Sequence, residues 1–293
     1  KWVQFANTLK LKLYLRQRFA RPTVAEQGIT DLYNSGAEFL SESANMAVFE
    51  GGDSKSNPFY EMDQRQLNTP NNLRASKTLF DFLHDNGDPR YQVLYQEAEN
   101  GGYEPMRQGD HDAPQDGAGS VDPADISVIR LSETDPVYFI SAAESYFMQA
   151  EVALVYGLGD VKANYDNGVK AAFNQLGLDG TTFVEAGGVY EFPTAGTEEE
   201  QFKAIMMQKW AGFARVQGIE GWMEWKRTGY PEVNTEGYNA ASYELGQFVS
   251  PVTNTIGENQ FPLRMIFPQS EYNNNPNTPE QVPVTQPVWW DQD

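Results

Sequence analysis

The sequence predicts a mainly α-helical fold in which pairs of helices carry a large irregular, loop-rich portion. Apolar residues recur at steps of three and four in six stretches, and helix start and stop signals flank several of them. The segments between are rich in turn-forming residues, and within them only a short helix around Ser76 to His84 is expected. Helices are expected at about residues 1–20, 24–40, 136–156, 161–176, 198–216 and 219–228, and irregular structure at 41–134 and 229–293.

The first two helices are expected to pack antiparallel, since only a short turn at Pro22 separates them. The apolar face of the first comprises Trp2, Phe5, Ala6, Leu9 and Leu13. Because this face is present from the first residues, we interpret the sequence as the C-terminal part of a longer protein whose missing residues pack on Trp2 and Phe5. All 293 residues are then one domain that lacks its N-terminal part.

A central helix pair is predicted at 136–156 and 161–176. Asp135 and Pro136 are typical of a helix start, as N-cap and first helical residue. The expected buried side of the first helix holds Ile140, Ala143, Phe147, Ala150 and Leu154. Gly157 and Gly159 favour its end, and Asp160 caps the next helix. The short connection predicts antiparallel packing.

A third pair is predicted after a glycine- and threonine-rich insertion at 177–196, which we interpret as a hairpin. Thr197 and Glu200 have the spacing of a capping box, and Gly218 ends the helix that follows. A short helix with Trp222 and Trp225 completes the pair. Helix pairs recur, but insertions stretch the tetratricopeptide spacing of about 34 residues.

Composition narrows the function classes. The chain has 21 basic and 41 acidic residues, a net charge of −20, which disfavours nucleic acid and anionic lipid as partners. Without cysteine it has no disulfide and no thiolate chemistry. No apolar run approaches the roughly 20 residues of a membrane span.

Catalytic signatures are weak, and we expect no catalytic residue. A glycine-rich phosphate loop and a nucleophile elbow are absent, and two histidines are the only imidazole bases. Glu220 with Glu224 and Glu144 with Glu151 share helix faces, as acid–base catalysis would need, but such pairs are more often solvated or salt-bridged.

The acidic segment 110–125 holds five aspartates around flexible glycines, and carboxylate oxygens are what calcium prefers. It does not fit an EF-hand, because Gln115 stands where glycine is required and Val121 replaces the terminal glutamate. We interpret it as a disordered acidic loop, with a calcium ion at 110–125 as the alternative and no other cofactor expected.

Four segments, in order, resemble one family. Residues Trp2–Leu13 are similar to the W-x-x-F-A-N-T-L-x-L-R-L helix of SusD/RagB-like outer-membrane lipoproteins. Asn86–Arg90 resembles their D-P-R turn, and Pro136–Ala153 their A-E-x-x-F-x-x-A-E helix. Gln208–Pro231 resembles their Q-K-W … W-x-x-x-x-R-T-G-Y-P block. Among the shared polar residues, Asn7, Arg90, Glu144, Glu151 and Arg227 are expected to hold the scaffold together.

The resemblance implies tetratricopeptide-like helix pairs (an α-α superhelix) and a non-enzymatic cell-surface receptor for glycans. It implies a lipid anchor in the outer membrane, absent from this chain, and a TonB-dependent, SusC-like transporter that imports the captured oligo- or polysaccharide. A peptide ligand within the same family, or a helical-repeat scaffold for protein partners, is the alternative.

Loop aromatics are the candidate ligand site, because aromatic faces stack on sugar rings. Tyr60, Tyr95 and Tyr103 lie in turn-rich stretches outside any helical stripe, and Arg107 is a polar partner for ligand hydroxyls. A groove lined by exposed aromatics would favour glycan binding, whereas burial of every aromatic would favour the scaffold.

Overall fold

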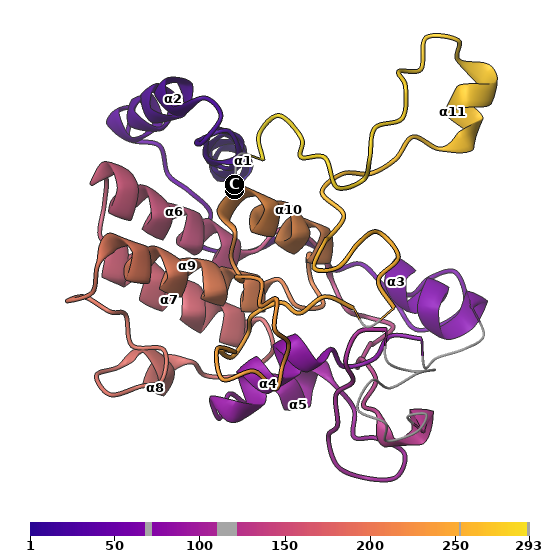
Figure 1. The fold of residues 1–293 in the computed structure, drawn as a ribbon. Coiled ribbons are helices and arrows are strands. Elements are labelled where there is room, and N and C mark those ends of the chain that lie inside the picture. Colours follow the sequence, from indigo (N-terminus) through magenta and orange to yellow (C-terminus); the bar gives the residue numbers. More distant parts are fainter. Residues whose placement is uncertain (68–71, 110–121, 252, 292–293) are drawn as a thin grey trace.

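The computed structural model describes residues 1–67, 72–109, 122–251 and 253–291 (Figure 1). The longer helices are α1 (Trp2–Arg16), α2 (Pro22–Asn34), α4 (Lys77–Asp85), α6 (Ala142–Tyr156), α7 (Val161–Asn174), α9 (Glu198–Gly212) and α10 (Gly218–Thr228). Shorter helical segments are α3 (Pro58–Tyr60), the π-helical η1 (Glu61–Gln66), α5 (Arg90–Leu94), the 3-10 turn η2 (Pro123–Asp125), α8 (Thr181–Val184) and α11 (Gln269–Asn274). The strands β1 (Ala44–Met46) and β2 (Val137–Ile140) pair antiparallel.

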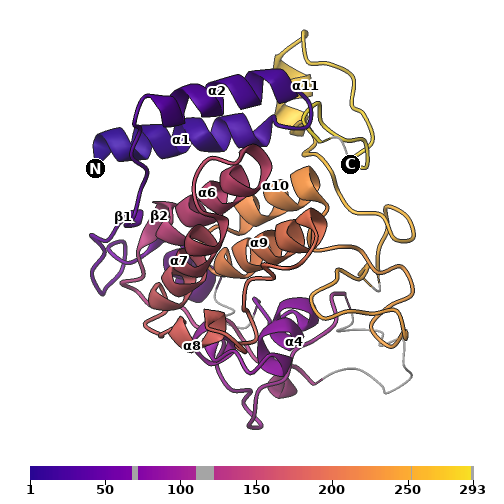
Figure 2. The same cartoon turned by 90° about the vertical axis from the view of Figure 1, so that its left-hand side faces the viewer.

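Three helix pairs form the body: α1 with α2, α6 with α7, and α9 with α10. In Figure 2, α1 and α2 lie side by side as a layer above α6 and α10, while α4 and α8 lie at the opposite end. The structure confirms the predicted fold class, mainly α-helical with tetratricopeptide-like helix pairs. Among the described residues, no helix is both long and apolar enough to cross a membrane.

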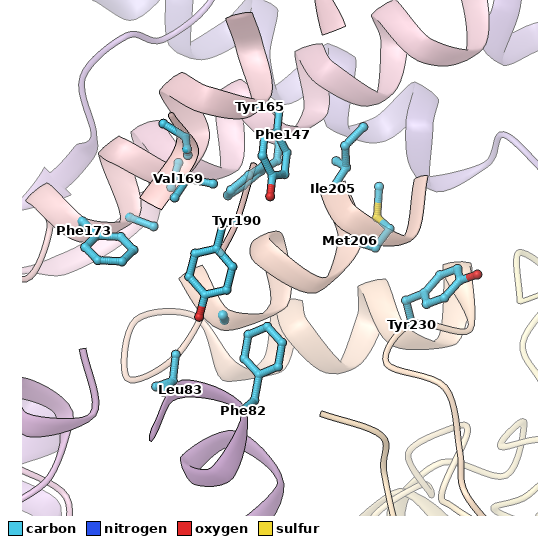
Figure 3. Packing of buried hydrophobic residues seen from close by; sticks show 14 of the residues in the cluster. Phe82, Leu83, Phe147, Tyr165, Val169, Phe173, Tyr190, Ile205, Met206 and Tyr230 are labelled. Atoms are coloured by element: carbon cyan, nitrogen blue, oxygen red, sulfur yellow. The ribbon is translucent and has the colours of Figure 1, made fainter. Parts of the chain in front are cut away.

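The main hydrophobic core lies where α6, α7 and α9 meet (Figure 3). Phe147, Phe173 and Ile205 contribute one fully buried side chain from each helix. On the side toward α4, the ring of Phe82 stacks on Tyr190, with centroids 6.0 Å apart. The Tyr190 hydroxyl donates to Asp88 at 2.8 Å, so the core also fixes the turn that follows α4.

The start predicted for the central helix is wrong. Asp135 and Pro136 precede strand β2, and α6 begins at Ala142, where Ser141 Oγ accepts a hydrogen bond from the Glu144 amide. Residues 137–140 are aromatic or β-branched and find a strand partner in β1, so tertiary pairing prevails over the local start signal.

Three other helices end earlier than predicted. α1 ends at Arg16 instead of about residue 20, and α9 at Gly212 instead of 216. α2 ends at Asn34 rather than 40, because Gly36 adopts a left-handed conformation with φ of 71°. Phe39 still packs on Tyr33 from this non-helical segment, with ring centroids 5.2 Å apart.

The apolar face predicted for α1 is the exposed one. Trp2 and Leu13 are 85% and 58% exposed, whereas Leu11 and Leu15 are buried. Leu11 and Leu15 pack against Met148 and Val152 of α6, which turns the other side of α1 outward.

The irregular portions contain more helix than predicted. In residues 41–134, α4 confirms the short helix expected around Ser76 to His84, but α3, η1, α5 and η2 are not predicted by the sequence, and neither is α11 in 229–293. The hairpin interpretation of 177–196 is wrong: the segment forms α8 and turns, with the Tyr190 amide donating to the Phe183 carbonyl.

A buried ionic cluster connects α1, α6, α9 and α10. Arg227 is fully buried and donates to both carboxylate oxygens of Glu151, at 2.7 and 2.8 Å, and to Glu224 at 2.7 Å. Burial alone would raise the pKa of these two carboxyls, but Arg227 and the neighbouring cations Arg18, Lys209 and Arg16 together outweigh burial and hold the pKa of both below its ordinary value. Further ion pairs are Lys12–Glu144, Lys12–Glu220, Arg16–Glu220, Arg16–Glu224, Arg18–Glu151 and Lys209–Glu224. The carboxylate pairs weighed for acid–base catalysis are therefore held in salt bridges.

Candidate functional site

The candidate site is a surface built around α4. Steps of four and three residues place Lys77, Asp81 and His84 on one side of this helix. Lys77 Nζ pairs with Asp81 at 2.6 Å, and the His84 side chain is about half exposed. Phe82 and Leu83 are buried in the core, so α4 is fixed on one side and open on the other.

Two tyrosines flank α4 on one side. The Tyr91 ring, from α5, meets Phe80 at 5.4 Å and His84 at 5.3 Å between centroids. Tyr103 stands perpendicular to Tyr91 at 5.2 Å. Both tyrosines are partly exposed, so this flank presents aromatic surface to solvent.

A second pair of tyrosines flanks the other side of α4. The Tyr238 hydroxyl lies 2.8 Å from Thr78 Oγ1, and its ring meets Tyr243 at 5.3 Å. Lys77 Nζ and the guanidinium carbon of Arg107 each lie 5.7 Å from the Tyr238 ring centroid. We define the α4 surface as Lys77, Asp81, His84, Tyr91, Tyr103, Arg107, Tyr238 and Tyr243.

The α4 surface has hydrogen-bonding groups that the fold does not use. Arg107 Nε is buried and has no hydrogen-bond partner among the described residues, and the buried Tyr243 hydroxyl is approached by the backbone of Gly246. Burial raises the pKa of Tyr243 to about 12 and also raises the pKa of Tyr238, so both hydroxyls stay protonated at neutral pH. The surface therefore combines aromatic faces with free donors, which suits a ligand that has both apolar and hydroxyl-bearing faces.

Three of the four predicted site residues lie around α4, but in different roles. Tyr103 and Arg107 belong to opposite flanks of the surface. Tyr95 is only 7% exposed and packs on Phe80, with ring centroids 6.0 Å apart. The expectation that Tyr95 is free of core packing is wrong, because α5 turns it toward the buried side of α4.

The fourth predicted residue, Tyr60, lies elsewhere. It ends the short helix α3, which Figure 1 shows apart from α4 and α5. Its nearest cation is Arg65, whose guanidinium carbon lies 5.5 Å from the ring centroid. Tyr60 therefore shares no contact with the α4 surface.

Sequence reasoning did not select Tyr91, Tyr238 and Tyr243. Tyr238 and Tyr243 lie between Gly237 and Gly246, in the same kind of turn-rich stretch that pointed to Tyr103. That signal was available in residues 229–293, but the stretch is far from Arg107 in sequence, and only the fold brings the two together.

The predicted calcium site lies mostly outside the described residues, since 110–121 are not described. Of its described aspartates, Asp122 caps η2 and Asp125 accepts a hydrogen bond from Asn100 at 2.8 Å. Elsewhere in the described ranges, no three His, Asp or Glu side chains are grouped as metal ligands.

Residues 1–268 match a protein family described as starch-binding and associating with the outer membrane. A comparison with curated proteins gives no match.

Three solved structures share the fold. A SusD homologue from Bacteroides uniformis aligns with 100% of this chain at a TM-score of 0.76 and 23% identity, covering 65% of that protein. A SusD homologue from Bacteroides vulgatus aligns with 99% of this chain at a TM-score of 0.75 and 22% identity, covering 62% of that protein. A chitin-binding SusD homologue from Flavobacterium johnsoniae aligns with 100% of this chain at a TM-score of 0.75 and 23% identity, covering 64% of that protein. This chain therefore spans less than two-thirds of the length of these structures, and the similarity at such identities shows the fold.

Proposed function

Because this chain belongs to the SusD-like family, described as starch-binding and associating with the outer membrane, we propose that it binds glycans without enzymatic activity, through the α4 surface. The observation that supports the proposal best is that partly exposed tyrosines lie on both flanks of α4, with unused hydrogen-bonding groups on one of them.

The geometry suits a sugar chain. The Tyr91–Tyr103 flank offers aromatic faces to the C–H side of sugar rings, a contact that stacks without a charge. Arg107, Lys77 and the Tyr243 hydroxyl lie on the other flank and can donate to sugar hydroxyls. We assign Tyr103 and Arg107 to the ligand site and Tyr95 to the support beneath it, while Tyr60 stays outside.

The whole protein is proposed to work at the cell surface. We propose that a lipid anchor outside this chain holds it in the outer membrane and that a TonB-dependent, SusC-like transporter takes up the captured glycan. A net charge of −20 is consistent with a protein that reaches the membrane through an anchor and a partner rather than through its own surface.

The proposal is tested by isothermal titration of residues 1–293 with maltoheptaose, chitohexaose and a mixed peptide library. The first two probes follow the family's starch-binding description and the chitin-binding homologue. Binding of at least one oligosaccharide is expected. Arg107→Ala and Tyr103→Ala should each weaken it about 10-fold, because a charged hydrogen bond or an aromatic contact contributes about 1–2 kcal/mol.

Tyr272→Ala is the matched control, because Tyr272 is an exposed tyrosine in α11, which projects away from the α4 surface (Figure 1). Its affinity should equal that of the parent. Peptide binding without oligosaccharide binding would favour the peptide-receptor alternative, and equal affinity in all variants would exclude the α4 surface.

A further inference from the structure

A cavity lies away from the α4 surface, with which it shares no residue. Its volume is about 420 Å³, within the range of about 300–1,000 Å³ typical of small-molecule sites. Its walls come from α3, the segment around β2, the end of α7 and the turn after α9, and the apolar lining comprises Phe59, Leu131, Pro136, Val137, Leu176 and Val216. We call it the Arg215 cavity.

Two walls of the Arg215 cavity are fixed by one side chain. The side-chain Oδ1 of Asn57 accepts hydrogen bonds from the Phe59 and Tyr60 amides at 2.8 and 3.2 Å, while its Nδ2 donates to the Asp135 backbone carbonyl at 2.8 Å. Phe59, on the first turn of α3, is 43% exposed and lines the cavity. Asn57 thus holds an accessible aromatic ring opposite the segment that leads into β2.

Two hydrogen-bond acceptors on the cavity lining have an oxygen that accepts no hydrogen bond from a described residue. Gln175 Oε1 is buried and has no hydrogen-bond partner in the described part of the chain. Asp135 accepts the Ser132 amide at 2.8 Å through Oδ2, which leaves Oδ1 for a ligand. Both residues line the cavity.

Donors face the same space. Arg215 donates from Nη1 to the Arg130 carbonyl at 2.9 Å, and it forms no salt bridge with a described carboxylate. The Tyr138 hydroxyl makes no hydrogen bond to another described residue, and both Arg215 and Asp135 act electrostatically on it. The three side chains therefore lie close together on the lining.

Arg215 also has an unusual backbone. Its φ is 64°, in the left-handed region that favours glycine, three residues after the end of α9. An arginine here costs conformational energy that a glycine would not, and such outliers cluster at ligand sites.

We propose that the Arg215 cavity is a separate saccharide site for one or two sugar rings, with Phe59 as the stacking face. A bound anion would need donors alone and a bound cation acceptors alone, whereas this lining mixes two donors with two acceptors around an apolar wall. Sugar hydroxyls both donate and accept, and sugar rings carry an apolar face, so a neutral saccharide matches the whole lining. The ligand class rests on the proposed glycan binding, but the location does not.

The test is a titration of residues 1–293 with maltose and with N,N′-diacetylchitobiose, followed by protein NMR at millimolar sugar. We expect saturable binding of at least one disaccharide. Tyr138→Phe removes only a hydroxyl and Arg215→Gly suits the left-handed backbone, so both variants should fold with a Tm no lower than that of the parent. Their affinity for the disaccharide should fall at least 5-fold and 10-fold, respectively. Asn259→Gly, also at a left-handed position with φ of 56°, and Tyr272→Phe are the matched controls and should bind like the parent.

The proposals for the Arg215 cavity and for the α4 surface can be disproved independently. Disaccharide binding that survives Arg107→Ala but not Tyr138→Phe supports the Arg215 cavity, even if maltoheptaose and chitohexaose do not bind the α4 surface. No disaccharide binding by the parent, or parental affinity in both Tyr138→Phe and Arg215→Gly, would overturn this proposal and leave the α4 surface untouched.

Discussion

Within the ionic cluster, Arg227 joins a carboxylate of α6 to a carboxylate of α10. It is fully buried and forms salt bridges with both Glu151 and Glu224. Arg227→Ala leaves two buried carboxylates without their main partner, so it should destabilise the fold by about 3–5 kcal/mol. Urea unfolding measures this loss.

The control is Lys203→Ala, which removes two partly exposed ion pairs, with Glu232 and Glu244. Exposed pairs contribute about 0–1 kcal/mol, so this variant should stay close to the parent. Similar losses for the two variants would mean that the buried cluster contributes no more than a surface pair.

The same carboxylates predict how stability depends on pH. The pKa of Glu151 and of Glu224 is lower in the folded chain than the ordinary value of 4.5. As pH falls below 4.5, these carboxyls are therefore protonated in the unfolded chain before they are protonated in the folded chain. Their stabilisation is present above pH 4.5 and is lost as pH falls through the folded values, by at most about 1.4 kcal/mol per pH unit for each carboxyl.

Glu144 acts in the opposite sense. Burial raises its pKa above 4.5, so it takes up a proton in the folded chain first and offsets part of the loss. Urea unfolding at intervals from pH 6 to pH 3 should show a net decrease in the free energy of unfolding, and a constant value over this range would contradict the assignment.

At the scale of elements, the contact between α6 and α7 depends on a glycine. A Cβ on Gly168 of α7 would lie 2.7 Å from the Phe147 ring, whereas a Cβ on Gly221 of α10 would have its nearest neighbour at 3.6 Å. Alanine gains about 1 kcal/mol over glycine inside a helix, but overpacking costs about 1–3 kcal/mol.

Gly221→Ala should therefore stabilise the fold and Gly168→Ala should destabilise it. Denaturant unfolding measures the free energy of unfolding of both variants. The difference between the two values reports the cost of overpacking, because the gain in helix propensity is common to both and cancels. Equal stabilisation by both would show that α6 and α7 pack more loosely than the structure indicates.

How much of an element could be predicted depended on whether its determinants are local. Asp160 and Thr197 cap α7 and α9 as predicted, because each bonds an amide three residues ahead. Strand β2 was missed because its partner β1 is distant in sequence. The candidate site follows the same rule: a turn-rich context selects Tyr60, Tyr95 and Tyr103 alike, but the burial of Tyr95 depends on Phe80 from another helix.

At the scale of the whole molecule, the charge of −20 predicts weak attraction to membranes. Purified residues 1–293 should not sediment with vesicles that contain anionic lipid at 0.1 M salt, because like charges repel. Co-sedimentation at this salt concentration would show that the chain has a membrane-binding surface of its own.

The central claim is that a glycan binds on the α4 surface, and the most direct test is a crystal structure of this chain with the oligosaccharide that binds most tightly in titration. We expect sugar rings against Tyr91 or Tyr103, with sugar hydroxyls within hydrogen-bond distance of Arg107 or Tyr243. An oligosaccharide held elsewhere on the chain, with the α4 surface empty, would contradict it.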